Sequence, residues 1–253
     1  MIKKTVKVPH TNGVARKARA SAAGKIRVAI QGIATSFHEV AAMTFFGSSS
    51  EVETVECLSF HELCESLDKG VANYAVMAIE NSIAGSILPN YFLLQSYHFT
   101  IIGELYLPIH MHLLALPGVK REDIRCIESH PMAIRQCAEF IHTLKNVEVR
   151  ESDDTALSAK RVKELKLKDT AAIANEFAAE KYGLQILEKR IETHKKNFTR
   201  FLVLAKRTNG KIESNKASLS FEVAHEVGSL AETLMIFKNN NINLTKIQSI
   251  PIG

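Results

Sequence analysis

The 253-residue sequence lacks any apolar stretch long enough to cross a membrane as a helix. Such a helix needs roughly 18 or more consecutive apolar residues. Apolar residues make up 46% and charged residues 23% of the chain, as in ordinary globular proteins. We therefore expect a protein that buries a substantial core, in one large α/β unit or two smaller ones. The longest apolar region, 91–119, is interrupted by Gln95, His98, Glu104, His110 and His112.

Signatures of metal, redox and nucleotide chemistry are also missing. The sequence contains no P-loop, no G-x-G-x-x-G and no G-x-S-x-G motif. We expect no metal and no cofactor, and we expect the cysteines to fill small apolar positions as reduced thiols. A cysteine nucleophile is the less favoured alternative. No C-x-x-C pair and no zinc-site spacing occur among Cys57, Cys64, Cys126 and Cys137.

Acidic residues are absent from residues 1–27, which carry eight Lys and Arg. The formal charge of +5 belongs to this segment, because the remaining chain has 24 basic and 27 acidic residues. Without a basic stripe interleaved with aromatic residues, we expect no nucleic-acid binding. We interpret residues 1–25 as a disordered leader, since they lack the apolar centre of a secretory signal. An organelle transit peptide is the alternative, so we expect a cytoplasmic protein or, in that case, one in an organelle stroma.

Strand-like and helix-like segments alternate from residue 26 to residue 206. Continuous apolar runs, such as 74–79, are typical of strands buried on both faces. The alternation predicts an α/β fold of two lobes, with mostly parallel sheets and a cleft between the lobes. The expected strands are 26–30, 52–58, 74–79, 110–116, 125–127, 147–150, 170–174 and 201–204. The expected helices follow Ser36 and span 60–69, 132–144, 155–165 and 176–182.

Four small hydroxyl side chains stand where a strand or turn leads into a helix: Ser36, Ser82, Ser129 and Thr155. Helix N-termini carry unpaired N–H groups and a partial positive charge, so they bind carboxylates and phosphates. In open α/β sheets these junctions gather at the carboxyl ends of the strands, where ligands bind. Ordinary N-capping explains any one of the four alone. Together they favour a small anionic ligand.

The segment 197–201, Asn-Phe-Thr-Arg-Phe, places Thr199 and Arg200 between two aromatic residues at the entry to an apolar strand. An arginine offers a fixed fork of donors for a carboxylate. A threonine beside it can donate a hydrogen bond or a proton to a leaving hydroxyl. Taken alone, an exposed strand edge with a solvated Arg200 explains the segment slightly better.

Taken in order, five segments resemble the prephenate dehydratase family. Because the match spans about residues 26–206 in the right order, it is more specific than any single motif. It implies a type II periplasmic-binding-protein-like catalytic domain, with lobe 1 at about 26–104 plus 190–206 and lobe 2 at about 105–189. The segments are the turn and helix at 32–42, E-N-S-x-x-G at 80–85, S-H-P-x-A-x-x-Q-C at 129–137, D-T-A at 154–156 and N-x-T-R-F at 197–201.

The resemblance implies a hydro-lyase that converts prephenate to phenylpyruvate in phenylalanine biosynthesis, with loss of carbon dioxide and water. Such chemistry needs positioning and hydrogen-bond donation. In this family's pattern Thr199 donates to the departing hydroxyl, Arg200 holds a carboxylate, and Phe201 completes the catalytic segment. Thr35 replaces a common glycine and Ile33 a common proline, and a β-branched residue at 35 is costly if the turn needs a positive φ. The implied substrate-binding residues are Ser36, Asn81, Ser82, Gly85, Ser129, Thr155 and Asn197.

Residues 207–216 are polar and predict a linker, and residues 217–253 resemble the start of an ACT regulatory domain. We expect strands at 217–223 and 242–250 with a helix at 228–239. Because an ACT domain is longer than this segment, we expect a truncated one. The resemblance implies a homodimer or homotetramer with L-phenylalanine as effector. Its effector loop matches Glu226, Gly228, Ser229 and Leu230, whereas 248–251 matches the family's E-S-R-P pattern poorly.

Two other functions stay open. The same chemistry on arogenate, which carries an amine in place of the keto group, gives phenylalanine directly, and the acid-free leader mildly favours it. A two-lobed fold with anion-binding helix starts also fits a non-catalytic module that binds or senses small anions or amino acids.

Overall fold

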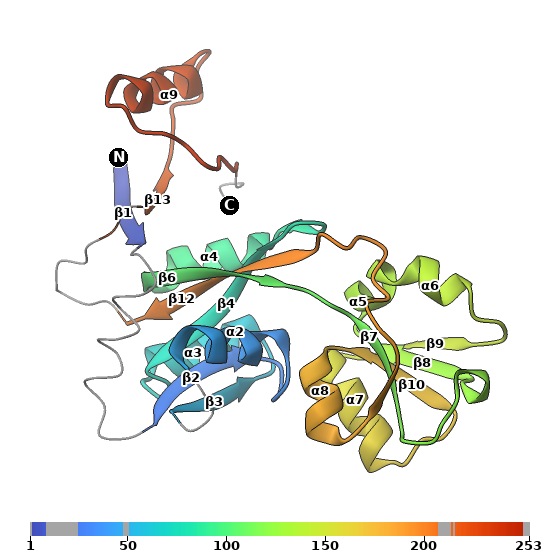
Figure 1. Ribbon diagram of the computed structural model, residues 1–253. Coiled ribbons are helices and arrows are strands. Elements are labelled where there is room, and N and C mark those ends of the chain that lie inside the picture. The colour runs from blue at the N-terminus through green and yellow to red at the C-terminus, as the bar shows by residue number, and fades with distance from the viewer. Residues whose placement is uncertain (1, 9–24, 48–50, 207–213, 215, 250–253) are drawn as a thin grey trace.

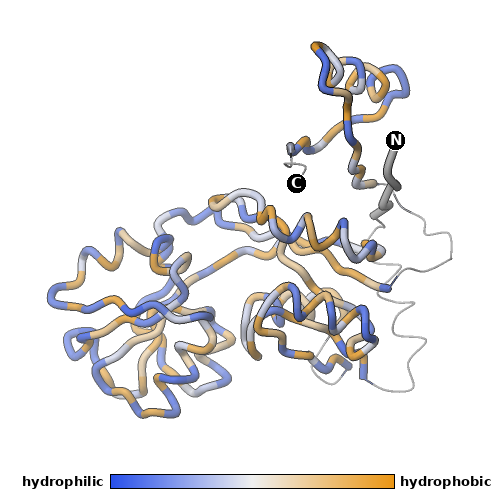
Figure 2. The backbone as a smooth tube through the Cα atoms, turned by 180° about the vertical axis from the view of Figure 1, so that it is seen from behind, coloured by the Kyte–Doolittle hydropathy of each residue, from blue (hydrophilic) through white to orange (hydrophobic). Residues whose placement is uncertain are grey.

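A computed structural model describes residues 2–8, 25–47, 51–206, 214 and 216–249. Two α/β lobes lie side by side, and the two-stranded sheet and helix α9 form a smaller unit beyond the first lobe (Figure 1). In Figure 2 the hydrophobic colour concentrates along the strands of both lobes. Among the described residues, no helix combines the length and the apolar character needed to cross a bilayer.

The first lobe is a six-stranded sheet in the order β3-β2-β4-β12-β6, with β5 beside β4. β2 lies parallel to β3 and β4, whereas β12 inserts antiparallel between β4 and β6. Helix α2 packs on one face of this sheet, and α3 and α4 pack on the other. The bounds are β2 (Ile26–Gln31), α2 (Phe37–Phe46), β3 (Val52–Cys57), α3 (Phe60–Asp68), β4 (Tyr74–Asn81), β5 (Gly85–Ser86), α4 (Leu88–Tyr97), β6 (Thr100–Pro108) and β12 (Phe198–Ala205).

The second lobe is a five-stranded sheet in the order β11-β7-β10-β8-β9. β8 lies parallel to β9 and β10, and β7 pairs antiparallel with β10 and β11. The bounds are β7 (His112–Ala115), the 3₁₀ turn η1 (Arg121–Asp123), β8 (Cys126–Ser129), α5 (Pro131–Gln136), α6 (Ala138–His142), β9 (Glu148–Glu151), α7 (Thr155–Glu164), β10 (Thr170–Ala174), α8 (Glu176–Tyr182) and β11 (Gln185–Glu188).

The predicted α/β class and two-lobed fold are confirmed, with three corrections to detail. Both sheets are mixed, so parallel pairing is limited to β3-β2-β4 and to β10-β8-β9. Residues 105–108, expected in lobe 2, belong to the first sheet because β6 pairs with β12 as far as Pro108. The single helix expected at 132–144 is divided into α5 and α6 at Cys137, whose φ of −108° and ψ of 14° interrupt the helix.

The chain crosses between the lobes twice, and the two crossings are hydrogen-bonded to each other. Ile109 N donates to Asn197 O at 2.8 Å, and Ile191 N donates to Met111 O at 2.9 Å. The buried carboxylate of Glu192 accepts from Met111 N at 3.1 Å. Although burial acts against ionisation, this bond and others lower the pKa of Glu192. A charged, hydrogen-bonded carboxylate therefore fixes the crossing.

Outside the lobes, β1 (Ile2–Val8) pairs antiparallel with β13 (Lys216–Phe221), and α9 (Ser229–Asn239) follows. Part of the expected disordered leader is therefore a strand, because the edge of β13 offers backbone partners to a segment rich in β-branched residues. Residues 242–249, expected as a strand, have no strand assignment. Most of the predicted linker, at 207–213 and 215, lies outside the described residues, while Lys216 opens β13.

His38 in α2 is buried between Phe60 and Phe201 and accepts a hydrogen bond from Ala78 N at 3.4 Å. Burial lowers its pKa from 6.5 to about 3, so the folded protein holds it neutral where the unfolded chain protonates it. Stability from this group is complete above pH 6.5 and is lost as the pH falls toward 3.

We predict that the free energy of unfolding falls by up to about 1.4 kcal/mol per pH unit in that window because of His38. His38→Gln keeps an acceptor for Ala78 N and should flatten the pH dependence. Denaturant unfolding between pH 4 and 7 measures it. His142→Gln, at an exposed position in α6, should leave the slope unchanged; equal slopes for all three proteins would contradict the prediction.

Candidate active site

Strands β4 and β12 pair so that Asn81 lies opposite Thr199 and Glu80 lies opposite Arg200. The register then shifts, because Ile79 is an extra residue in β4 before the next pair. β12 itself stays regular against β6 over this stretch, so its side chains alternate between the two faces. Thr199 shares the α2 face with the buried Phe201, and Arg200 points to the α3 and α4 face.

The side-chain amide of Asn81 holds Thr199 in place. Its Nδ2 donates to Thr199 Oγ1 at 3.0 Å, to Asn197 Oδ1 at 2.8 Å and to Phe198 O at 3.2 Å. Because Oγ1 of Thr199 accepts this bond, its own O–H is available to donate elsewhere. Thr199 is half-buried, so that donor can reach a bound molecule.

The loop after Asn81 is folded around the same side chain. Asn81 Oδ1 accepts from the N–H groups of Ile83 and Ala84 at 3.0 and 2.9 Å. Ser82 Oγ accepts from Phe198 N at 2.9 Å, so this serine joins the loop to β12. Gly85, with φ of 80°, returns the chain to pair with Asn81. Ser82 and Gly85 thus shape the loop that positions Asn81.

Asn197 connects this cluster to the second lobe. It is fully buried, accepts from Asn81, and donates through Nδ2 to Gln136 Oε1 at 2.9 Å. Gln136 is the last residue of α5 in lobe 2. A chain of hydrogen bonds therefore runs from α5 through Asn197 and Asn81 to Thr199.

The lobes meet on the face that carries Thr199. Leu107, the β6 partner of Thr199, packs against the cores of both lobes, and so does Phe37 at the start of α2. Ser36 caps α2 by accepting from Glu39 N at 3.4 Å and is buried. The helix start that the sequence predicted at Ser36 therefore lies at the junction between the lobes.

The turn before α2 also contacts lobe 2 directly. A Cβ on Gly32, whose φ is +92°, would lie 2.7 Å from Asp154 Oδ2. Asn175 Nδ2 donates to Thr35 O at 2.7 Å. Thr35 has a φ of 74°, so the positive φ considered from the sequence is present, at a cost of about 1–2 kcal/mol for an L residue.

Asp154 caps α7 and brings Thr155 to the same junction. Its Oδ1 accepts from Ala156 N and Leu157 N at 2.7 and 3.1 Å. Burial raises the pKa of Asp154, and these two N–H groups oppose the shift. Thr155, the first residue of α7, is buried next to this cap. Ser36 and Thr155 therefore begin two helices that flank the contact between Gly32 and Asp154.

Two expected site residues have other partners. Arg200, expected to hold a substrate carboxylate beside Thr199, lies on the opposite face and donates to Glu104 through Nε at 2.8 Å. The hydroxyl of Ser129 is buried and donates to Ile173 O at 2.6 Å, so it ties β8 to β10. Strand alternation explains the position of Arg200, and a nearby backbone acceptor explains the bond of Ser129; the substrate roles of both residues stay predictions.

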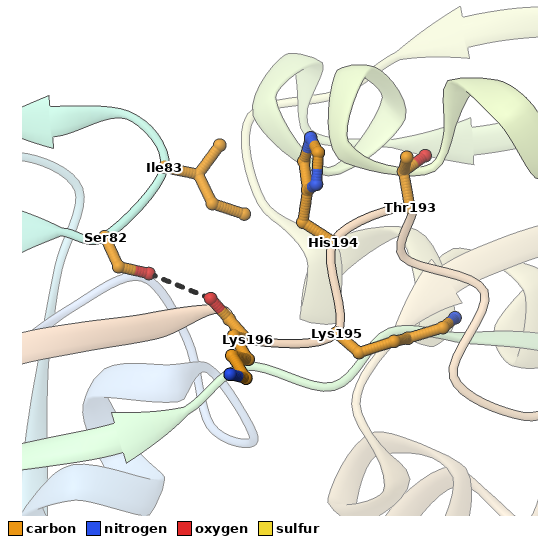
Figure 3. A pocket seen from close by; sticks show the side chains of 6 residues that line it. All are labelled: Ser82, Ile83, Thr193, His194, Lys195 and Lys196. Atoms are coloured by element: carbon orange, nitrogen blue, oxygen red, sulfur yellow. Dashed lines mark hydrogen bonds between the residues drawn. The ribbon is translucent and has the colours of Figure 1, made fainter.

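A cavity of about 530 Å³ opens next to Asn81. It lies between the loop of Ser82 and Ile83 and the returning crossing at 193–196 (Figure 3). Lys195 points away from Ser82 and donates to Glu192 O at 2.6 Å. Lys196 and His194 are exposed at this cavity, so Lys196 offers a cationic side chain and His194 an imidazole beside the hydrogen-bonded cluster.

Several residues in and around the candidate site were not among the candidates predicted from the sequence. Gln136 stands in the S-H-P-x-A-x-x-Q segment and Asp154 in D-T-A, so the motifs contained the signal. Asn175 and Glu104 carried no comparable motif, because their roles depend on contacts between segments about 100 or more residues apart.

The expected effector loop leads into α9. Gly228 has a φ of 91° and precedes the helix, and Ser229 Oγ donates to Glu226 O at 3.1 Å. Leu230 is half exposed. These contacts form a local turn before α9. The role of this turn in effector binding stays a prediction.

In a comparison with known proteins, the matching family model and the curated relatives point to the same family. A family model described as prephenate dehydratase matches residues 28–209. Arogenate dehydratase/prephenate dehydratase 1 of Arabidopsis thaliana is 38% identical over 232 residues, which cover 90% of this chain and 57% of that protein. This chain spans 53–59% of the length of the first curated relatives it matches.

Two solved structures share the fold over most of the chain. Prephenate dehydratase from Arthrobacter aurescens, in complex with L-Phe, is 26% identical with a TM-score of 0.77, covering 89% of this chain and 76% of that one. GqqA, described as a novel type of quorum quenching acylase, is 27% identical with a TM-score of 0.74, covering 89% and 82%.

We predict that Gly32→Ala lowers the free energy of unfolding and separates the lobes. The alanine Cβ would meet Asp154, and the positive φ of residue 32 disfavours alanine. Gly118→Ala is the matched control: its φ is +86°, but nothing lies within 4 Å of the added Cβ. Both variants should lose about 1 kcal/mol of stability to backbone strain. Gly32→Ala should lose more and should also show a larger radius in small-angle scattering, an effect absent if the contact with Asp154 is unimportant.

Proposed function

The chain belongs to the prephenate dehydratase family, and on that premise we propose that it converts prephenate to phenylpyruvate. The observation that carries the proposal is the hydrogen bond from Asn81 Nδ2 to Thr199 Oγ1. That bond directs the threonine hydroxyl so that its proton is free for a departing group. The bound substrate needs such a donor where its ring hydroxyl leaves.

In the proposed reaction, the bond between the ring and its carboxylate breaks and its electron pair forms the new ring double bond. The ring hydroxyl departs and takes a proton, so carbon dioxide and water are released and the ring becomes aromatic. Thr199 supplies hydrogen-bond donation and the proton to the leaving oxygen, and solvent restores it. General-acid assistance of this kind contributes about 10²–10⁴-fold to a rate.

The same geometry supports binding of a dianion. The N-termini of α2 and α7 meet at the lobe junction, and helix N-termini attract carboxylates. Lys196 adds a cationic side chain at the neighbouring cavity. Ser36, Thr155 and the loop of Asn81 and Ser82 are the proposed substrate contacts, and Arg200 contributes indirectly.

Arogenate is the second candidate substrate, because a curated relative at 38% identity is named an arogenate dehydratase/prephenate dehydratase. An acylase activity like that named for GqqA fits less well. An acyl-transfer nucleophile needs a base beside it, whereas the described partner of the Thr199 hydroxyl is an amide. Names of relatives that include "chloroplastic" also support an organelle location as a proposal for this chain.

L-Phenylalanine is the proposed effector, supported by the complex described for the Arthrobacter aurescens enzyme. The segment 226–230 is the proposed contact, and an oligomer of two or four chains is the proposed assembly. The boundary of the regulatory part at about residue 217 is also a proposal, supported by the start of β13 at Lys216.

We predict that Thr199→Ala lowers phenylpyruvate formation by about 10²–10⁴-fold, because the donor to the leaving hydroxyl is lost. Thr199→Ser keeps the hydroxyl and should retain much of the rate. Thr100→Ala is the control, since Thr100 lies at the other end of the same sheet, opposite Ala205. Ultraviolet detection of phenylpyruvate measures the rates, and a Thr199→Ala rate near that of the unaltered protein would sink the proposal.

A competition assay separates the substrates. Both substrates are supplied together, and phenylpyruvate from prephenate and phenylalanine from arogenate are measured separately. We expect turnover of prephenate. Calorimetric binding of prephenate without turnover would instead support a non-catalytic sensing module.

A further inference from the structure

Arg200 is a largely buried cation on the reverse face of the strand that carries Thr199. Its side chain is 11% exposed, and its Nη2 lies 2.6 Å from Glu104 Oε2. Its Nη1 lies 3.6 Å from Glu80 Oε2. The carboxylates belong to β6 and β4, the two strands that flank β12. Arg200 therefore joins three neighbouring strands by charge.

Each of the two carboxylates also binds a lysine from residues 216–249, the C-terminal segment. Lys216 Nζ lies 2.6 Å from Glu104 Oε1, and Lys246 Nζ lies 2.9 Å from Glu80 Oε1. Lys246 also donates to Ser86 Oγ at 2.7 Å, next to the loop that follows Asn81. Three cations and two carboxylates thus form one network, in which Lys216 and Lys246 attach the C-terminal segment to the first sheet.

The charges favour each other's ionised forms. Burial opposes ionisation of Glu104, yet Lys216 and Arg200 lower its pKa. Burial also opposes the charge of Arg200, yet Glu104 raises its pKa. Partly buried ion pairs are screened by water less than exposed pairs are, so this network can fix the positions of the strands.

The backbone joins this network directly to Asn81 and Thr199. Glu80 is the residue before Asn81, and Arg200 is the residue after Thr199. The extra residue Ile79 allows Glu80 to face Arg200 while Asn81 faces Thr199. A change in the pairing of Glu80 or Arg200 therefore rotates or shifts the two residues that set the direction of the threonine hydroxyl.

The contact between the first sheet and the C-terminal segment contains open space around these charges. A cavity of about 300 Å³ separates the sheet from the C-terminal segment and is lined by Tyr106, Phe198 and Thr245 as well as the charged groups. Tyr106 and Phe198 are 59% and 42% exposed. Lys216 and Lys246 line this space, and Gln95 Nε2 and Ser86 Oγ add hydrogen bonds to Ser220 Oγ at 2.7 Å and to Gln248 Oε1 at 3.3 Å.

We propose that Lys216 and Lys246 are positioning residues for Thr199, acting through Glu104, Glu80 and Arg200 from the opposite face of the sheet. The proposal rests on the proposed dehydratase function and adds to it a coupling between the C-terminal segment and the rate. Attachment of this segment holds β4 and β12 in the register that directs the Thr199 hydroxyl. Its release lowers the rate constant while the substrate contacts on the other face remain.

The test removes each lysine charge and measures chemistry and binding separately. Lys216→Gln and Lys246→Gln should each lower kcat, and the double variant should lower it about ten-fold, which corresponds to about 1.4 kcal/mol. KM should stay within about two-fold, because a lost transition-state interaction lowers kcat without weakening ground-state binding. Lys216→Arg and Lys246→Arg keep the charge and should retain kcat. Lys189→Gln, which breaks an exposed 3.6 Å pair with Glu176, is the matched control.

A second readout follows the Thr199 methyl resonance in threonine-labelled full-length protein. It should move in the Gln variants and stay in place in Lys189→Gln and in the Arg variants. Unchanged kcat together with an unmoved Thr199 resonance overturns the proposal. If the unaltered protein has no dehydratase activity, the proposed function fails, while a moved resonance still supports the coupling. If the double variant is unfolded, the single variants, each keeping one lysine, decide the outcome by the same readouts.

Discussion

The side chain of Asn81 is the interaction on which the site depends. Its Nδ2 serves Thr199, Asn197 and Phe198, and its Oδ1 serves the N–H groups of the following loop. One amide thus fixes a hydroxyl, a strand end and a loop. An amide can do this because it carries donors and an acceptor in a fixed plane. A carboxylate lacks the donors and an aliphatic side chain lacks both.

The same cluster shows why the site needs two lobes. Asn197 connects Asn81 to Gln136 across the junction, while Gly32 and Thr35 contact Asp154 and Asn175 on the other side. Backbone strain at Thr35 persists at this junction, where contacts between the lobes over-determine the turn. The hydrogen bond from Met111 N to Glu192 fixes the crossing and so holds the two lobes in position. The candidate site and the contact between the lobes are therefore parts of one hydrogen-bonded arrangement.

Some elements could be predicted from local pattern and others could not. The strand at 170–174 and the helix ended by Gly183 were predicted within a residue, because apolar runs and a left-handed glycine act locally. Helix α4 escaped prediction: its N-cap, Ile87, makes no side-chain capping bond, and Asn90 on its buried side bonds to Ala78 O. The strand expected at 242–250 is absent over the described residues 242–249, and β13 pairs with β1.

The sequence by itself determined the α/β class, the segment at 197–201 and the family pattern, since these depend on local periodicity and on residues close together in the chain. Only the tertiary structure decided that Thr199 and Arg200 lie on opposite faces of one sheet. A strand alternates its side chains, but the identity of each face depends on which helices pack there and on the extra residue in β4. Likewise, Glu104 and Lys216 meet because β6 and β13 are brought together in space, although they are 112 residues apart.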